Sequence, residues 1–327
     1  MIFKNIRTSL LWRVLTILLI TTACTATNPS TPDAGSQQPV TLRIAVLPIL
    51  DAFPMHAAQQ LGLYEKHGVK VELIPVGSAP ERDQLIASSQ ADGMLNEALS
   101  SMIYNQDQVQ VQILRFARAA TTDTPLFSIL ASGNSGISDL EGLKGIPIGI
   151  SEGTIIDYLT DRLLEAEGFT SSEIETVAVP KISDRMALLG SGELKAAMLP
   201  EPLSYLGIQQ GAKLIINDTS HPEYSYSTIA FRKPIIDQNP QAIKAFLAAI
   251  EEATIEINKD PNQWKQLMVE LKLLPASLAE SFQVPTFTTA GVPSESQWLD
   301  VLAWAKMKGM TDKDIPYQDS VNANFLP

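Results

Sequence analysis

Two short segments with nearly the same sequence carry the acidic residues best suited to catalysis or to ligand binding. The segment Met94 to Ser100 shares Met, Leu, Glu, Leu and Ser with the segment Met198 to Ser204 at equivalent positions. Glu97 and Glu201, one in each copy, are candidates for a general acid and base or for two contacts to one bound molecule. Chance recurrence of apolar strings, with each glutamate serving only as a helix cap, is the simpler alternative.

The surroundings of the two segments are also alike, which predicts a duplicated architecture. Arg82 and Arg185 precede the two copies at nearly equal distances, each near the start of an expected helix that leads through a turn into a strand. Each strand then ends in a Glu-bearing loop, and ligands collect at the carboxyl ends of strands in open parallel sheets. We therefore expect Asn96 and Glu97 on one wall of a cleft and Glu201 on the opposite wall.

The turn formed by Ser151, Glu152, Gly153 and Thr154 is a second candidate for ligand contact. It follows an expected strand and opens an expected helix, so its backbone N–H groups and the helix dipole favour an oxygen of a bound molecule. Ser151 or Thr154 is then either a ligand contact or an N-cap, and capping alone accounts for both residue types.

The loop from Pro48 to Met55 follows the first expected strand and contains Asp51 and Phe53. Asp51 is suited to a cationic or N–H-bearing solute, or it caps the following helix. Phe53 is either a wall of the pocket or a core residue.

These residues predict the charge of the ligand. Four of the candidates are carboxylates: Asp51, Glu97, Glu152 and Glu201. In a cleft without an obvious Arg or Lys, each like-charge pair at about 4 Å costs several kcal/mol, so an anion is disfavoured. We expect a pyrimidine, an amine-bearing solute or another heterocycle rich in donors. An anion held by the helix terminus and by Arg82 or Arg185 is the second choice.

Short apolar runs alternate with amphipathic segments from Val40 onward, which indicates parallel strands with crossover helices and an α/β fold. Strands are expected at 41–47, 69–75, 126–131, 146–150, 174–179, 194–199, 212–216 and 226–231. Helices are expected at 52–67, 80–89, 154–167, 184–189, 241–258, 262–271, 275–282 and 295–310. Gly62 and Gly68 punctuate the first helix, which should end near His67.

The pattern predicts two α/β lobes with a ligand cleft between them and at least two chain crossings. Residues 40–125 and 232–327 form lobe 1, and residues 126–231 form lobe 2. The strand expected at 226–231 leads back toward lobe 1.

The N-terminal residues are typical of an export signal. Lys4, Arg7 and Arg13 precede the apolar stretch Val14 to Ala23, which is short for a transmembrane helix, and Cys24 follows it. We therefore expect residues 1–23 to be a signal peptide.

The segment around Cys24 resembles a bacterial lipobox, with Thr21 in place of the usual leucine. Residues 24–39 are rich in Thr, Pro, Ser, Gly and Gln, which predicts a flexible tether. The resemblance implies that Cys24 is lipidated and anchors an extracytoplasmic protein to the cell membrane, in the periplasm or on the outer face. Secretion with an incidental cysteine is the alternative.

The composition excludes several functions. The chain has 24 Lys and Arg against 36 Asp and Glu, for a formal net charge of -12, so nucleic acid is not an expected partner. The single cysteine allows no internal disulfide. His56, His67 and His221 lack the spacing of metal ligands, and we expect neither a metal site nor a cofactor.

Three motifs in order resemble a known family. They are Leu42 to Pro54 with Gly62 to Val69, then Ile137 to Gly145, then Ser151 to Thr154. Together they are similar to type II periplasmic binding proteins of the nitrate, sulfonate, taurine and thiamine-precursor branch (NMT1/THI5-like) of ABC-transporter substrate-binding proteins. The resemblance covers most of residues 40–232.

The resemblance implies a two-lobed, monomeric protein that closes on a small solute and then docks on an ABC permease driven by its ATPase. Enzymes also occur on this fold, including thiamine-precursor synthases, and a solute sensor for a membrane receptor would have the same body. An enzyme is disfavoured because the enzymes of this kind lack export signals, and the synthases' cysteine-rich motif is impossible in a chain with one cysteine.

Overall fold

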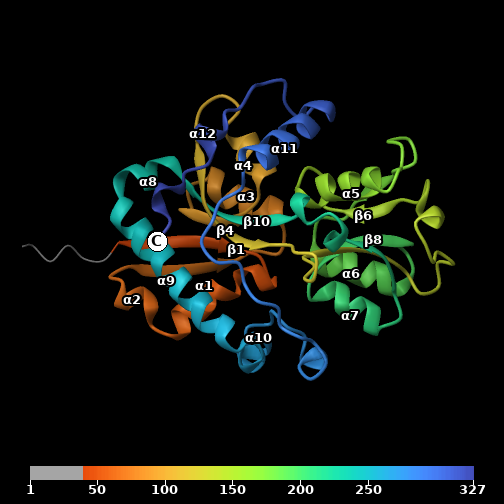
Figure 1. Ribbon diagram of the computed structural model, residues 1–327, viewed down its shortest axis with the longest axis horizontal. Helices are drawn as coiled ribbons and strands as arrows, with labels where there is room; N and C mark the ends of the chain where they lie inside the picture. The colour runs from red at the N-terminus through yellow and green to blue at the C-terminus, as the bar shows by residue number, and fades with distance from the viewer. Residues whose placement is uncertain (1–39) are drawn as a thin grey trace, which may run out of the picture. The chain divides into compact units, whose positions relative to one another are not determined.

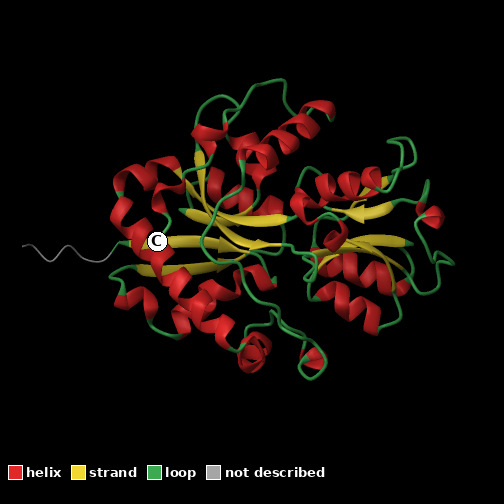
Figure 2. Cartoon of the chain, viewed as in Figure 1, coloured by secondary structure: helices red, strands yellow, loops and turns green. Residues whose placement is uncertain are grey.

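The computed structural model describes residues 40–327. The predicted signal peptide, the tether and Cys24 lie outside the described residues. Two five-stranded sheets organise the described part of the chain, and they stand next to each other with helices on both faces (Figure 1). Figure 2 shows the strands in two separate groups. The two-lobed α/β architecture expected from the sequence is therefore confirmed.

The first sheet has the strand order β2-β1-β3-β10-β4. Its members are β1 (Thr41–Val46), β2 (Lys70–Pro75), β3 (Gly93–Asn96), β4 (Val111–Ala119) and β10 (Tyr226–Arg232). β1 pairs in parallel with β2 and β3, and β10 is antiparallel to β3 and β4. Leu42, Ile44 and Val46 of β1 pack into one apolar cluster and Ala45 packs into another, as expected of a strand in a sheet that is covered on both faces.

The second sheet repeats this pattern with the order β7-β6-β8-β5-β9. Its members are β5 (Phe127–Ala131), β6 (Ile148–Ile150), β7 (Thr176–Ala178), β8 (Ala196–Pro200) and β9 (Lys213–Asn217). β6 is parallel to β7 and β8, whereas β5 is antiparallel to β8 and β9. β3 and β8 thus hold equivalent places, which confirms the duplication predicted from the two Glu-bearing segments.

Helices cover both faces of each sheet (Figure 1). In the first lobe, α1, α2 and α9 lie on one side, and α3 and α4 lie on the other. The helices of this lobe, with α8 and α10 included, are α1 (Phe53–Gln60), α2 (Leu63–Lys66), α3 (Ala79–Ala87), α4 (Ala98–Tyr104), α8 (Lys233–Gln238), α9 (Pro240–Lys259) and α10 (Lys265–Glu270). The longest, α9, buries Ile243, Phe246, Leu247, Ile250 and Ile257, which is the spacing of one apolar helix face.

In the second lobe, α5 lies on one side of the sheet, and α6 and α7 lie on the other (Figure 1). Their bounds are α5 (Ile155–Ala166), α6 (Ile182–Ser191) and α7 (Leu203–Gln209). α5 begins where Thr154 accepts a hydrogen bond from the backbone N–H of Ile156. The sequence therefore places this helix start correctly.

One C-terminal helix contacts both lobes. α11 (Glu295–Met307) packs on α4 of the first lobe. It also contacts α5 of the second lobe, because the indole N–H of Trp304 donates to the Asp161 carboxylate at 2.8 Å and Asp300 pairs with Arg162 at 3.0 Å. The assignment of all of 232–327 to lobe 1 therefore omits the contact that α11 makes with the other lobe.

The chain crosses between the sheets after β4 and again after β9, and Asp218 joins these crossings. Its carboxylate accepts hydrogen bonds from the backbone N–H groups of Leu126 and Phe127 and from the hydroxyl of Ser225. β10 follows Ser225 and lies in the first sheet. The range 126–231 for lobe 2 is therefore wrong at its end, since the lobe stops before Tyr226.

Several local elements differ from the sequence-based expectation. The helix expected at 52–67 is divided into α1 and α2 by Gly62, which has a φ of 67°, a conformation that glycine adopts readily. The expected helix at 275–282 is only a single 3-10 turn at Ala276–Leu278. β4 was not expected. Of the remaining short elements, α12 spans Tyr317–Ser320, and 3-10 turns occur at Leu50–Ala52, Glu141–Leu143, Asp218–Ser220, Pro222–Tyr224, Pro261–Trp264 and Ala323–Phe325.

No helix within residues 40–327 combines the length and the apolar character needed to cross a membrane.

Candidate functional site

A cavity lies between the two lobes, at the ends of β1, β3, β6 and β8. Its polar lining residues are Asp51, Arg82, Asn96, Glu97 and Ser227 from the first lobe and Ser151, Thr154 and Arg185 from the second. Apolar side chains such as Ile49, Phe127 and Ile155 complete the walls. The cavity has a volume of about 50 Å³, which is room for a few water molecules.

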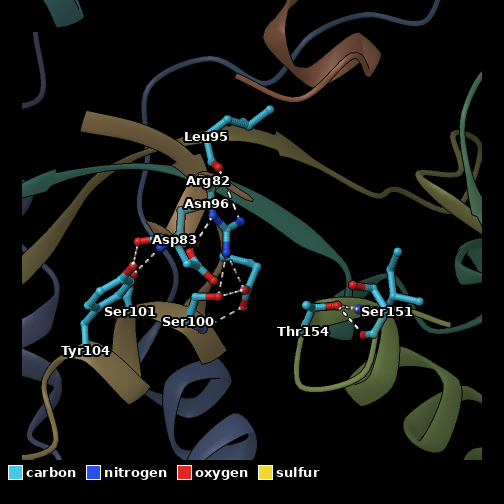
Figure 3. Close-up of polar contacts among 11 residues, drawn as sticks. Arg82, Asp83, Leu95, Asn96, Ser100, Ser101, Tyr104, Ser151 and Thr154 are labelled. Carbon is cyan, nitrogen blue, oxygen red and sulfur yellow. Dashed lines mark hydrogen bonds and ion pairs between the residues drawn. The ribbon is translucent and has the colours of Figure 1, made fainter. Parts of the chain in front are cut away.

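Arg82 and Glu97 form a buried network on the wall of the first lobe. Figure 3 shows Arg82 of this network next to Asp83 and Ser100. Arg82 donates to Asp83 at 2.8 Å and to the Ser100 hydroxyl at 2.7 Å, and its Nη2 lies 3.7 Å from Glu97 Oε1. Glu97 is the N-cap of α4 and accepts from the Ser100 N–H at 3.1 Å. Burial raises the pKa of Glu97, although Arg82 and Ser100 oppose the rise. Glu97 thus lines the cavity while both of its carboxylate oxygens accept hydrogen bonds from Ser100.

Asn96, the last residue of β3, lines the cavity next to this network. Its Nδ2 donates to the Ser101 hydroxyl at 2.9 Å. Its Oδ1 has no hydrogen-bond partner among residues 40–327, although the side chain is buried. A buried carbonyl oxygen in this state is suited to accept from a bound molecule.

The turn between β6 and α5 forms part of the opposite wall, and Figure 3 shows Ser151 and Thr154 across from the Arg82 network. Thr154 Oγ1 donates to the Ser151 carbonyl at 2.7 Å and accepts from the Ile156 N–H at 3.2 Å, so Thr154 is an N-cap. Ser151 Oγ has no partner in the described part of the chain. Of these two alternatives, ligand contact therefore fits Ser151 better and capping fits Thr154.

Glu152 and Gly153 from the same turn do not line the cavity. Glu152 is exposed. Gly153 has a φ of 69°, and its N–H donates to the Asp157 carboxylate at 2.9 Å. That acceptor occupies one of the N–H groups expected to face a ligand.

Asp51 lines the cavity but is already paired. Its carboxylate accepts from the Ser227 hydroxyl at 2.5 Å and lies 3.5 Å from Arg118. Because Ser227 lies on β10 and Arg118 on β4, Asp51 joins the loop after β1 to both strands that adjoin the crossings. This role in the fold leaves little of the carboxylate for a cationic solute.

Phe53 is a core residue and is absent from the cavity lining. Its side chain is fully buried, and its ring lies 6.0 Å from the Trp264 ring and 5.9 Å from the Phe287 ring. The expectation of a pocket wall at Phe53 is therefore not met.

Glu201 does not face Glu97 across the cavity. It lines a different pocket together with Arg118 and Tyr205, and Pro200 is the residue of its loop that reaches the cavity. Burial raises the pKa of Glu201 against the opposing charge of Arg118. The two lobes share a topology, but the two glutamates point into different pockets.

Two buried arginines line the cavity, so the expectation of a carboxylate-rich pocket without Arg or Lys is wrong. Arg185 on α6 donates to the carbonyl oxygens of Met198 at 2.8 Å and Val179 at 2.7 Å. It forms no ion pair within residues 40–327, and burial lowers its pKa to about 10. It is still charged near neutral pH, so the second lobe presents an uncompensated cation to the cavity.

Sequence reasoning placed Arg82 and Arg185 upstream of the two repeated segments without assigning them to the primary site. Their equivalent spacing was the available signal, because equivalent positions on a duplicated fold face the same edge of the sheets. Ser227 had no such signal. It reaches the cavity only because β10 returns to the first sheet beside β3.

In the part of the chain that the structure describes, no group of three or more His, Cys, Asp or Glu side chains is arranged to hold a metal ion.

Comparisons with known proteins agree with this architecture. The family model described as NMT1/THI5 like matches residues 50–264. A putative thiamine biosynthesis protein from Haemophilus influenzae is 26% identical over 67% of this chain and 70% of its own length. A putative aliphatic sulfonates-binding protein from Bacillus subtilis is 23% identical over 67% of this chain and 65% of its own length. The chain thus spans about two thirds of these relatives.

Solved structures share the fold at low sequence identity. The periplasmic aliphatic sulphonate binding protein SsuA from Escherichia coli has a TM-score of 0.70 at 19% identity, covering 85% of this chain and 95% of its own. The desulfurization enzyme DSZB has a TM-score of 0.67 at 12% identity, covering 87% of this chain and 97% of its own. Binding proteins and an enzyme therefore share this architecture, which is the type II periplasmic binding protein fold.

Proposed function

Because the chain belongs to the NMT1/THI5-like family, we propose that it is an extracytoplasmic solute-binding protein of an ABC importer. It binds one small solute in the cavity between its lobes and delivers it to a permease whose ATPase drives transport. The observation that carries this function is the cavity itself, which both lobes line with buried polar side chains at the ends of their strands. Ligands of open α/β sheets bind at this place.

Catalysis by Glu97 together with Glu201 has no support in the geometry. Glu97 lines the cavity, whereas Glu201 lines a separate pocket with Arg118. General acid–base catalysis requires both groups within reach of one substrate. Binding without turnover is therefore the function that we assign to the cavity, in agreement with the relatives that are named as binding proteins.

The N-terminal residues supply the location in this proposal. A signal peptide at 1–23, a lipidated Cys24 and a tether at 24–39 would hold a monomeric body at the membrane surface, close to the permease. Diffusion on such a tether keeps the solute-loaded protein near its partner.

Binding in this cavity requires the lobes to move. A cavity volume of about 50 Å³ is too small for most metabolites, so the lobes must stand further apart both when a solute enters and when they enclose it. Two chain crossings join the lobes, and further contacts come from α11, from α4 against α5 and from Tyr205 against Phe282. Solute contacts with both walls would stabilise the closed arrangement over the open one.

Two measurements on residues 40–327 test this function. A library of small solutes is screened for an increase in melting temperature, because a ligand present at 100 times its Kd stabilises the native state by about 2.7 kcal/mol. Small-angle scattering is then recorded with and without the best solute. We expect a smaller radius of gyration on saturation. Unchanged dimensions with a solute of proven affinity would contradict closure, and measurable turnover of that solute would contradict the binding function.

A further inference from the structure

Three polar atoms at the cavity have no hydrogen-bond partner among residues 40–327: Asn96 Oδ1, Ser151 Oγ and Arg185 Nη2. Their side chains are nearly inaccessible, with exposed fractions of 2%, 3% and 0%, and all three residues line the cavity. Buried polar atoms in folded proteins are almost always paired, and an exception needs an explanation. A bound molecule that forms hydrogen bonds with all three atoms would explain why they have no partner in the described part of the protein.

The two arginines at the cavity differ in a way that identifies the position of the charge. Arg82 is neutralised by Asp83 and Glu97, at 2.8 and 3.7 Å. Arg185 occupies the equivalent place in the second lobe but donates only to the carbonyl oxygens of Val179 and Met198. The glutamate of its own lobe, Glu201, lines another pocket. A buried guanidinium without a carboxylate favours an anion from outside the chain.

On the basis of the proposed function, we infer that the solute is a small anion that also carries an N–H or O–H donor. Its negatively charged oxygen accepts from Arg185 Nη2 on the second lobe. Its donor binds Asn96 Oδ1 on the first lobe, and Ser151 Oγ pairs with either group. Apolar walls that include Ile49 and Phe127 accept an apolar body between the two polar ends.

This arrangement couples recognition to closure. Asn96 lies on β3 of the first lobe, and Arg185 lies on α6 of the second. A solute with only the anionic group pairs with Arg185 on the second lobe, and a solute with only the donor pairs with Asn96 on the first. A solute with both groups makes contacts on both walls and gains more from the closed state.

A screen by charge class tests the inference. Solutes are sorted into anions with a donor, anions without one, neutral donors and cations, with 4-aminobenzoate, benzoate, aniline and benzylamine as size-matched representatives of the four classes. We expect the largest rise in melting temperature among anions with a donor. The affinity of the best solute is then measured by calorimetry.

Variants of the two arginines separate ligand binding from structure. Arg185→Met is expected to weaken the best anion by about ten- to a hundred-fold, because a hydrogen bond to a charged group is lost. Arg185→Lys should recover part of the affinity. The melting temperature of the unliganded Arg185→Met protein should fall, because the carbonyl oxygens of Met198 and Val179 lose this donor, but no buried carboxylate loses its partner. Arg82→Met leaves the carboxylates of Asp83 and Glu97 without their cationic partner, so it should lower the melting temperature more than Arg185→Met does.

The outcomes distinguish the two proposals. If the best solutes are cations or neutral donors, or if Arg185→Met binds the best anion as tightly as the wild type, the inference is overturned while the solute-binding function stands. If no class raises the melting temperature of the wild type, the proposed function itself fails and the inference fails with it.

Discussion

Replacing Arg118 with methionine should cost about 3–5 kcal/mol of unfolding free energy, the range for removing one partner of a buried ion pair. The guanidinium of Arg118 lies 3.5 Å from Asp51 and stabilises the charged forms of Glu201 and Asp218. Its side chain is 2% exposed. Without this cation, three buried carboxylates lose their shared countercharge, and all three lie beside the chain crossings. Urea unfolding monitored by tryptophan fluorescence measures the loss.

The loss should depend on pH. Burial raises the pKa of Asp218 to about 6 and also raises that of Glu201. A carboxyl whose pKa is higher in the native state than in the unfolded state binds more protons when folded, so stability falls as pH rises from about 4 to about 6. Removing Arg118 raises these pKa values further. The Arg118→Met penalty should therefore be largest at pH 7 and smaller near pH 4.

A matched control separates the cluster from ordinary ion pairing. Arg162→Met removes a cation that is 17% exposed and pairs with Glu165 and Asp300, and it should cost only about 1 kcal/mol. The double variant Asp51→Asn with Arg118→Met should recover part of the loss. Equal penalties for Arg118→Met and Arg162→Met at pH 7 would show that the cluster has no special role.

Trp304→Ala is expected to destabilise the native state by about 3–5 kcal/mol, the range for large-to-small changes of buried aromatic residues. The Trp304 side chain is fully buried in α11, packs edge-on against Tyr158 of α5 at 5.6 Å and donates to Asp161. The variant leaves a cavity and removes one of the hydrogen bonds that join α11 to the second lobe. Chemical denaturation of the variant and the wild type at one pH measures the difference.

The same helix offers two controls for this prediction. Leu299 is 53% exposed, and Leu299→Ala should cost less than about 1 kcal/mol because little apolar area leaves the interior. Trp304→Phe keeps one six-membered aromatic ring and loses the pyrrole part of the indole with its N–H donor, so its loss should be intermediate. If Trp304→Ala unfolds at the same urea concentration as Leu299→Ala, α11 does not hold the lobes as we describe.

Much of the fold was predictable because it depends on periodic local signals. The alternation of strands and helices and the helix start at Thr154 are set by hydrophobic spacing and capping, which are both readable from neighbouring residues. Gly62 was recognised in the sequence, but the division of the expected helix at this glycine was not predicted. The equivalence of β3 and β8 was visible in their shared Met-Leu-x-Glu pattern. The place of α11 was not predictable, because its contacts with Asp161 and Arg162 join residues that are distant in sequence.

The site was predictable only in part, for the same reason. Ser151, Asn96 and Glu97 follow buried strands, and strand ends meet at the cavity edge. Phe53 and Glu201 sit at similar strand ends, but the direction of a side chain within a loop depends on contacts that the sequence does not display. Glu201 turns toward Arg118 of the other lobe. Arg185 is important because, within residues 40–327, no carboxylate pairs with its guanidinium. Sequence spacing cannot show that a charged side chain lacks a partner.

The most direct test of the central claim is native mass spectrometry of residues 40–327 after incubation with a defined mixture of small solutes. The wild type should retain one solute per chain. Ala79→Trp, which adds bulk at a half-buried residue of the cavity wall, should retain none, whereas Ala303→Trp at an exposed position on α11 should behave as the wild type. If the wild type shows only the mass of the protein without a solute, or if Ala79→Trp retains as much solute as the wild type, solute binding between the lobes is contradicted.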